Sequence, residues 1–505
     1  MLLAAGPSHA ERPVDCVGAA QRLRGRLAVW AGLLLALAGC ASQAPQRTEV
    51  PAVAVPPAWT TALPGGEGTG SVAATALAQW WLRFDDPLLA DLVARAQQAN
   101  TSIATAQAAL RQARALRDVA AAGLLPVVGS SASVQRSKSG NNSAANSFRA
   151  GLDAGWEPDV FGGHRSALDA SQATAQASAA TLGDVQVSIA AEVALAYISL
   201  RNAQARLAIA NDNLASQLET AQLTQWRLQA GLLSSLEGEQ SRAAAEQTRA
   251  QLPGLQSSIE QTAHALAVLT GQPPAALTTW LAATRAVPQA SDDLALAIPA
   301  EALRQRPDVR AAEQQVGAAL ARVAEADAAR LPSFKLSGSI GLSALTLGTL
   351  TSGASVVSAL AAGVSLPVFD GGAARARVRA QQAALDQAGS AYRAVVLTAL
   401  KEVEDALVAL RGDRERLARL QRAAEASANA ALLARQRFDS GLADFQTVLD
   451  TQRSQLSTQD GVAGARADVS ADHVRLYKAL GGGWRPDGSD AAASPDAEVN
   501  RTPNS

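Results

Sequence analysis

Side chains that could perform catalysis or bind a metal are few and scattered in this 505-residue chain. Cys16 and Cys40 are the two cysteines. The histidines stand alone at four positions: His9, His164, His264 and His473. These residues have neither the spacing of a zinc site nor the number that a disulfide framework needs. No Gly-x-Ser-x-Gly turn or phosphate-binding loop accompanies them. The sequence therefore predicts no enzyme, no metal site and no cofactor, and we interpret the last three histidines as polar residues on helix faces.

The charge balance and composition narrow the class of protein further. The chain has 44 basic and 45 acidic residues, a formal net charge of −1, which gives no electrostatic basis for binding nucleic acid. Hydrophobic residues make up 48% of the chain and aromatic residues 4%. Ala, Leu and Val therefore carry the apolar content, which favours long, closely packed helices over a bulky globular core.

The N-terminus has the pattern of an export signal that ends at a cysteine. Three arginines at positions 22, 24 and 26 precede the apolar run 27–39, which is too short to span a bilayer. The run ends in Leu-Ala-Gly before Cys40, a sequence that resembles the lipobox of bacterial lipoproteins. The resemblance implies cleavage after residue 39 and acylation of Cys40, and Ala41 implies sorting to the outer membrane. The alternative is an ordinary signal peptide with an unpaired cysteine.

The rest of the chain contains an internal repeat, in which one unit of sequence motifs occurs twice. Leu125-Pro126 recurs 206 residues later as Leu331-Pro332, and Gly231-Leu232 recurs 210 residues later as Gly441-Leu442. We therefore expect a signal peptide (1–39), a lipidated tether (40–75), a first repeat (76–275), an inter-repeat equatorial segment (276–305), a second repeat (306–484) and a disordered tail (485–505).

Each repeat contains two segments in which apolar and polar residues alternate. The clearest of these segments extend from Phe148 to Trp156 and from Phe334 to Leu342. Two further segments lie at Pro126–Arg136 and Leu360–Leu366. A period of two marks half-buried strands, and about ten residues are enough to cross a bilayer at a tilt. Soluble hairpins are the alternative.

A very long helical run follows each strand pair. Apolar residues recur every seven positions, as in Val193, Leu200 and Leu207, which favours coiled-coil packing. A helix from Gly163 to Ala230 would be ~100 Å long. Each run breaks at Gly231 or Gly441, and a second helix returns to Gly271 or Gly481. Shorter helices are expected before the strands, over Pro87–Ala122 and Pro307–Arg330.

Four strands require more than one copy of the chain if they cross a membrane. Backbone groups exposed to lipid must be paired, so strands cross only in closed barrels, and bacterial single-chain barrels begin at eight strands. Three copies would supply twelve strands and leave a lumen.

Several motifs occur together in the order that is typical of one family. They resemble the TolC-like outer-membrane factors, and the lipobox and two of the motifs resemble the NodT-type lipoprotein branch. The motifs are Trp80-Trp81-x-x-Phe84-x-Asp86-Pro87-Leu88, Asn100-x-x-Ile103-x-x-Ala106, Gly271-Gln272-Pro273-Pro274, Arg306-Pro307-Asp308-Val309-x-x-Ala312-Glu313 and Pro367-Val368-Phe369-Asp370-Gly371-Gly372.

The resemblance implies an α+β membrane protein that forms a homotrimer. The trimer would have a twelve-stranded β-barrel in the outer membrane and an α-helical periplasmic tunnel. Its partners would be outer-membrane lipid, a periplasmic adaptor and an inner-membrane pump of the resistance-nodulation-division type. The expected function is a passive exit duct. The alternatives are the channel of a type I protein secretion system or a structural coiled-coil surface lipoprotein.

The resemblance also assigns roles to the two turns and to the helix that follows the second. The turns match the family's adaptor-docking tips, here represented by Arg227, Gly231, Leu232, Ser234, Arg437, Gly441 and Leu442. The periplasmic gate would involve Gln446, Asp450 and Arg453. Asp450 and Arg453 lie three residues apart, close enough on a helix to form an ion pair. Gln446 and Thr447 replace a hydrophobic residue and an aspartate that relatives carry, so the tightness of the gate stays open.

Overall fold

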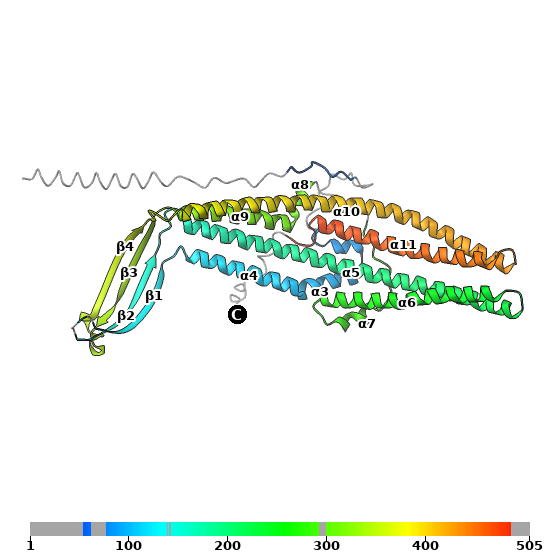
Figure 1. Cartoon of the computed structure of the whole chain (residues 1–505), viewed down its shortest axis with the longest axis horizontal. Coiled ribbons are helices and arrows are strands. Elements are labelled where there is room, and N and C mark those ends of the chain that lie inside the picture. The colour runs from blue at the N-terminus through cyan, green and yellow to red at the C-terminus, as the bar shows by residue number, and fades with distance from the viewer. Residues whose placement is uncertain (1–53, 62–76, 139, 141–142, 292–298, 486–505) are drawn as a thin grey trace, which may run out of the picture.

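The computed structural model describes residues 54–61, 77–138, 140, 143–291 and 299–485. The predicted signal peptide, Cys40 and residues 486–505 lie outside the described residues. Within the predicted tether, Thr60 donates hydrogen bonds from its backbone N and its Oγ1 to Glu404 Oε1, both at 2.6 Å. Figure 1 shows an elongated molecule with the strands at one end and the turns of two long helical hairpins at the other.

The strands form one antiparallel sheet in chain order. Their bounds are β1 Val127–Ser137, β2 Ala145–Trp156, β3 Ser333–Ala344 and β4 Val356–Ser365. All four predicted segments are therefore strands. Leu152 lies opposite Ile340 in the β2–β3 pair, and Asp153 lies opposite Ser339. Because neighbouring positions alternate between faces, the even-numbered residues form a largely apolar face and the odd-numbered ones a face rich in Ser and Gly.

Three helices of the first half recur in the second half with the same lengths of 22, 67 and 35 residues. The first half contains α3 Pro87–Ala99, α4 Thr101–Ala122, α5 Gly163–Gln229, α6 Ser235–Leu269 and α7 Thr278–Leu281. The second contains α8 Pro299–Gln305, α9 Pro307–Ala328, α10 Ala373–Asp439 and α11 Phe445–Ala479. Short 3-10 turns lie at Trp80–Phe84, Pro274–Leu277, Leu347–Thr349 and Gly353–Ser355. With 67 residues each, α5 and α10 are ~100 Å long.

The duplication extends to individual hydrogen bonds. Asn100 precedes α4, and its Nδ2 donates to the carbonyl of Leu269 at the end of α6, at 2.9 Å. Arg306 precedes α9, and its Nη1 donates to the carbonyl of Ala479 at the end of α11, at 2.8 Å. In both repeats, a side chain at a helix start thus satisfies a carbonyl that the long hairpin leaves unpaired at its end.

The predicted single helix over Pro87–Ala122 is wrong in one respect, because it breaks at Asn100. This residue has extended backbone (φ −69°, ψ 132°) and ends α3 while it caps α4. Its Oδ1 accepts from the backbone N of Ser102 at 2.8 Å. An asparagine that caps a new helix competes with continuation of the old one, which explains the break.

The apolar core lies around the middle of the long helices. Trp80 is fully buried and stacks on Tyr477, with the ring centroids 5.5 Å apart. Val193 and Leu200 from the predicted heptad row are also fully buried. By length and composition, α5 could cross a membrane, yet it packs along α4, α6, α9 and α11 within the helical body.

Candidate functional site

The two predicted tips are sharp turns of the same construction. Gly231 and Gly441 have φ values of 73° and 72°, a left-handed conformation that favours glycine. The backbone N of Leu232 donates to the Arg227 carbonyl at 2.8 Å, and that of Leu442 to the Arg437 carbonyl at 2.7 Å. This is the Schellman pattern of helix ends. The side chains of Leu232 and Leu442 are 72% and 78% exposed, so both point away from the hairpins.

The returning helices begin with different caps. Ser234 and Glu237 form a capping box at the start of α6, with Glu237 Oε2 accepting from the backbone N of Ser234 at 2.6 Å. Asp444 caps α11, and its Oδ1 accepts from the backbone N of Thr447 at 2.8 Å. The hydrogen bonds from the Thr447 side chain and backbone lower the pKa of Asp444. Ser234 is thus placed as a cap, and Thr447 as the partner of one.

Arg227 and Arg437 have the same position in the repeat but different surroundings. Arg227 lies over the ring of Phe438, with 4.4 Å between the guanidinium carbon and the ring centroid. Its Nη1 donates to the Phe438 carbonyl at 3.3 Å, and its Nη2 lies 3.4 Å from Asp439 Oδ1. Arg437 is exposed and makes no side-chain hydrogen bond or ion pair with a described residue. Arg227 therefore joins the first tip to the second within one chain, whereas Arg437 faces solvent.

Sequence reasoning missed an aromatic cluster that holds the second tip together. Phe438 and Phe445 lie on either side of the turn with their ring centroids 5.5 Å apart, and both are buried with Val448 and Leu449. Trp226, beside Arg227 on the first hairpin, is instead 59% exposed. The low aromatic content was the available signal, because three of the chain's few rings fall within or beside the two tips.

The predicted gate residues lie together on the exposed face of α11. Gln446 Nε2 donates to Asp450 Oδ1 at 3.0 Å, while Arg453 Nη1 lies 3.5 Å from the same oxygen. The side chains of Asp450 and Arg453 are 58% and 52% exposed. An exposed ion pair of this length contributes little to stability. The closer partner of Asp450 is thus Gln446, one of the two residues that depart from the family pattern.

A polar seam lies beneath this face, where α11 meets the first hairpin. Gln452 Nε2 donates to Thr220 Oγ1 at 3.0 Å, and both residues are buried. The Oε1 atoms of Gln452 and Gln217 are buried without a hydrogen-bond partner among the described residues. Unpaired buried acceptors cost about 1–3 kcal/mol each. At this level the two hairpins therefore meet through a hydrogen bond between buried polar side chains.

The prediction that His473 is a polar residue on a helix face is wrong, because its side chain is buried between α10 and α11. Its Nδ1 donates to the Val469 carbonyl at 2.8 Å, and its Nε2 accepts from Arg414 at 3.1 Å. Both ring nitrogens are engaged in hydrogen bonds within the chain, so the residue is not available to bind a ligand. Among the described residues, no cluster of His, Cys, Asp and Glu could hold a metal ion.

Asp472, next to His473, is a buried carboxyl with an unusual proton affinity. Burial is the main cause that raises its pKa from the ordinary 3.8 to about 6. A contact with Asp413 also raises the pKa, while the Arg475 guanidinium at 2.6 Å lowers it. Between these two pH values the folded chain holds a proton that the unfolded chain has lost. Stability from this group is therefore present below about pH 4 and is lost as the pH rises through 6.

We expect Asp472→Asn to raise the midpoint of thermal unfolding at pH 7.5 by a few degrees and to leave it nearly unchanged at about pH 3.5, where both the folded and the unfolded chain hold most of the proton. Circular dichroism of the purified protein across this range measures the effect. The matched control is Asp468→Asn, one turn earlier, because the Asp468–Arg416 pair is half exposed and contributes little. A lower midpoint for Asp472→Asn at pH 7.5 would mean that the charged form is the stabilising one.

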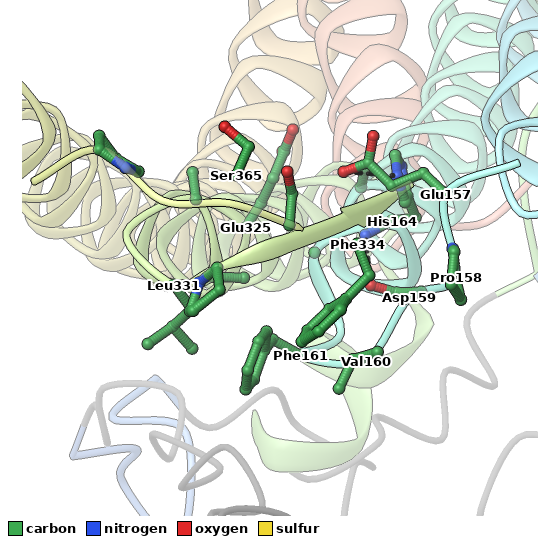
Figure 2. Close-up of a pocket in the computed structure, with 17 residues that line it drawn as sticks. Glu157, Pro158, Asp159, Val160, Phe161, His164, Glu325, Leu331, Phe334 and Ser365 are labelled. Carbon is green, nitrogen blue, oxygen red and sulfur yellow. Dashed lines mark hydrogen bonds and ion pairs between the residues drawn. The ribbon is translucent and has the colours of Figure 1, made fainter. Parts of the chain in front are cut away.

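A pocket of about 350 Å³ lies where the strands meet the helices (Figure 2). The rings of Phe161 and Phe334 face each other there with their centroids 6.3 Å apart. Asp159 precedes α5, and its carboxylate accepts from the backbone N of Arg165 in the first turn of that helix at 2.8 Å. His164 Nε2 lies 4.0 Å from Glu157 Oε1. These contacts fix the turn between sheet and helix, and none supplies a nucleophile with a positioned base.

The sequence matches one protein family in both of its halves. The family described as "Outer membrane efflux protein" matches residues 92–272 and again residues 298–482. The pyoverdine export outer membrane protein OpmQ of Pseudomonas putida is 35% identical over 422 residues, which cover 81% of this chain and 89% of that protein. Nodulation protein T of Rhizobium leguminosarum bv. viciae is 30% identical over 83% of this chain and 86% of that protein.

The fold also matches solved structures. The outer-membrane channel OprN superposes with a TM-score of 0.79 at 36% identity, over 86% of this chain and 99% of that one. VceC of Vibrio cholerae superposes with a TM-score of 0.75 at 26% identity, over 81% and 99% of the respective chains. Together with the family match, these similarities confirm the resemblance that the sequence motifs indicated.

Proposed function

The chain belongs to the outer membrane efflux protein family, and from this premise we propose that it is the outer-membrane channel of a tripartite efflux system. It works as a passive exit duct for small substrates that an inner-membrane pump delivers through a periplasmic adaptor. The observation that carries the proposal is the pairing of an open four-stranded sheet with helical hairpins ~100 Å long.

The sheet supports a barrel that several copies share. β1 and β4 are its two edge strands, and the outer edge of each has no described strand beside it. The apolar face of the sheet is exposed, with Val134, Leu360 and Val364 each more than 60% accessible. Unpaired edges and an apolar face both require cover. Three copies joined edge to edge in a lipid bilayer would satisfy both needs with twelve strands.

The helical hairpins would form a tunnel through the periplasm, with the tips at its inner end. There the adaptor docks on the exposed turns, at Gly231, Leu232, Gly441 and Leu442, with Arg437 as the available cation. We assign Arg227 a different role, which is to hold the two tips of one chain together. Ser234 acts as a helix cap beside this surface.

Acylation of Cys40 would add a second attachment to the outer membrane. Several acyl chains give firm anchoring where a single chain is marginal. The cargo is proposed as a class. Relatives are described as export proteins for pyoverdine, toluene and solvents. These differ in chemistry, as expected of a duct that serves whichever pump recruits it.

The size and conductance of the purified protein test the function. Protein extracted from outer membranes with mild detergent is expected to have the mass of three chains and to carry ion current in planar bilayers. A single chain in the micelle, or a trimer that passes no current under any applied voltage, would refute the proposed function. The same preparation after heat denaturation serves as the control for current that leaks through the bilayer without a folded channel.

Asp450→Ala is expected to raise the mean single-channel conductance by roughly twofold or more and to weaken block by divalent cations. Three symmetry-related carboxylates near one axis attract cations, and their removal abolishes that binding. Asp450→Asn, which keeps the shape, should behave like the alanine variant, whereas Asp450→Glu should behave like the parent. Unchanged conductance and cation block in both neutral variants would remove Asp450 from the gate.

A further inference from the structure

The edge strands β1 and β4 could pair with those of neighbouring copies in more than one register. β1 and β4 each have one edge without a described partner strand, and every residue in either strand is exposed. If copies join at these edges, many alignments are available in principle. A slip by one residue moves every side chain to the opposite face, whereas a slip by two keeps the faces and alters the pairing. Face polarity alone therefore leaves several alignments possible.

The duplication supplies the missing information, because one repeat-to-repeat junction is present inside the chain. It is the antiparallel pair β2–β3, in which the last strand of the first repeat meets the first strand of the second. A junction between copies would again join the last strand of one repeat, β4, to the first strand of another, β1. In a closed ring of three such chains, junctions inside a chain alternate with junctions between chains, and both join the same kinds of strand.

The structure fixes how positions in one repeat correspond to positions in the other. α4 and β1 begin at Thr101 and Val127, while α9 and β3 begin 206 residues later, at Pro307 and Ser333. α5 and α10 begin 210 residues apart, at Gly163 and Ala373.

The hairpins independently agree with these two offsets. Val128 lies opposite Ala154 in the first hairpin, and Phe334 lies opposite Val364 in the second. Phe334 follows Val128 by 206 residues, and Val364 follows Ala154 by 210. The correspondence between strands is therefore established without reference to the seam between copies.

We propose that β4 of one copy pairs with β1 of the next in the register that the β2–β3 junction dictates. In that junction, Ala154 lies opposite Gly338 and Leu152 opposite Ile340. The equivalent positions place Val364 opposite Ala132 of the next copy and Ala362 opposite Val134 of the next copy. This inference rests on the proposed function, since it specifies the shared barrel.

The polarity of the faces is consistent with this register although it was not used to derive it. Val364 and Ala362 lie opposite Phe334 and Leu336 of β3, so they belong to the largely apolar face of the sheet. Ala132 and Val134 share the face of Leu152, through their pairs with Ala150 and Phe148 in β2. The proposed seam thus continues the apolar face without interruption. A slip by one residue would set Val134 against Ala361, on the face rich in Ser and Gly.

One feature of the internal junction has no counterpart at the seam. Gly151 lies opposite Gly341, and a Cβ built on Gly341 would be 2.6 Å from the carbonyl oxygen of Ala150. The equivalent seam positions are Ala361 and Gln135 of the next copy. The internal pair therefore permits a closer approach of the backbones than the seam does, while the register of the flanking pairs stays the same.

Cysteine pairs test the register directly, because directly opposite Cα atoms lie within disulfide range and diagonal ones do not. In the full-length protein, Ala362→Cys is combined in turn with Val134→Cys, Ala132→Cys and Arg136→Cys. The last two pairs report slips of two residues in either direction. After mild oxidation in the membrane, we expect Val134→Cys to give at least about fivefold more covalent trimer than either slipped pair.

Two further variants keep the outcome interpretable. Leu152→Cys with Ile340→Cys is the equivalent pair inside one chain, so it should oxidise without a change in mass and shows that the geometry permits a disulfide. Ala362→Cys alone should give no covalent trimer. A preference for a slipped pair in a protein of trimeric mass would overturn the register and leave the duct intact. A protein of monomeric mass would instead overturn the proposed function.

Discussion

Cells that depend on this protein are expected to lose export when Gly441 is replaced by tryptophan, while the trimer remains in the outer membrane. The turn leaves open space around Gly441, with no atom within 4 Å of a Cβ placed there. A tryptophan can therefore be accommodated within the chain. It would occupy the surface beside Leu442, which is where an adaptor helix must approach the backbone closely. Drug or solvent tolerance of a strain lacking the parental gene measures the loss.

A second variant separates the backbone strain caused by replacing Gly441 from the effect of the bulky tryptophan side chain. Gly441 has a φ of 72°, so any L-residue there costs about 1–2 kcal/mol. Gly441→Ala carries the same strain with one small methyl group, and we expect it to retain most of the export. The amount and mass of each variant in the outer membrane are measured in parallel. Normal export by Gly441→Trp at parental abundance would exclude adaptor docking at the second tip.

Gly341→Val is expected to prevent assembly of the channel almost completely. Gly341 lies in β3, opposite Gly151, and a Cβ there would be 2.6 Å from the Ala150 carbonyl oxygen and 2.7 Å from the Gly151 Cα. Both contacts are with backbone, which cannot rotate away as a side chain can. Overpacking of this kind costs about 1–3 kcal/mol per site, and each trimer contains three sites. The yield of trimer resistant to mild detergent is the measurement.

A valine elsewhere in the same sheet controls for the loss of a glycine. Gly155 lies in β2 on the same face, and a Cβ built there would have no atom within 4 Å. Gly155→Val should therefore assemble nearly as well as the parent. Equal yields of trimer from Gly341→Val and the parent would mean that β2 and β3 do not approach as closely as described.

The strands and helices could be read from the sequence because their signals are local. Alternation of apolar and polar residues predicted all four strands, and the long runs without proline predicted α5 and α10. The two Gly-Leu pairs predicted both tips, since a left-handed residue that ends a helix is usually glycine. The break at Asn100 was the exception. There the capping side chain, and not the apolar period, decided the boundary.

The roles of individual side chains were harder to predict, because they depend on neighbours from distant segments. Arg227 and Arg437 have the same motif around them, yet Arg227 packs on Phe438 from the other hairpin and Arg437 is exposed. His473 has the appearance of a surface residue in its helix, yet α10 covers it. No periodicity within one helix reports which face another helix will bury.

The sequence by itself determined the elements, their duplication and the number of strands in one chain. These follow from spacing along the chain, which local backbone geometry converts into helix, strand or turn. The tertiary structure decided which side of each element is covered, and so separated the tip arginines and gave Asp472 its raised pKa. It also set the strand registers, because hydrogen bonding between strands joins residues that lie up to nearly 200 positions apart.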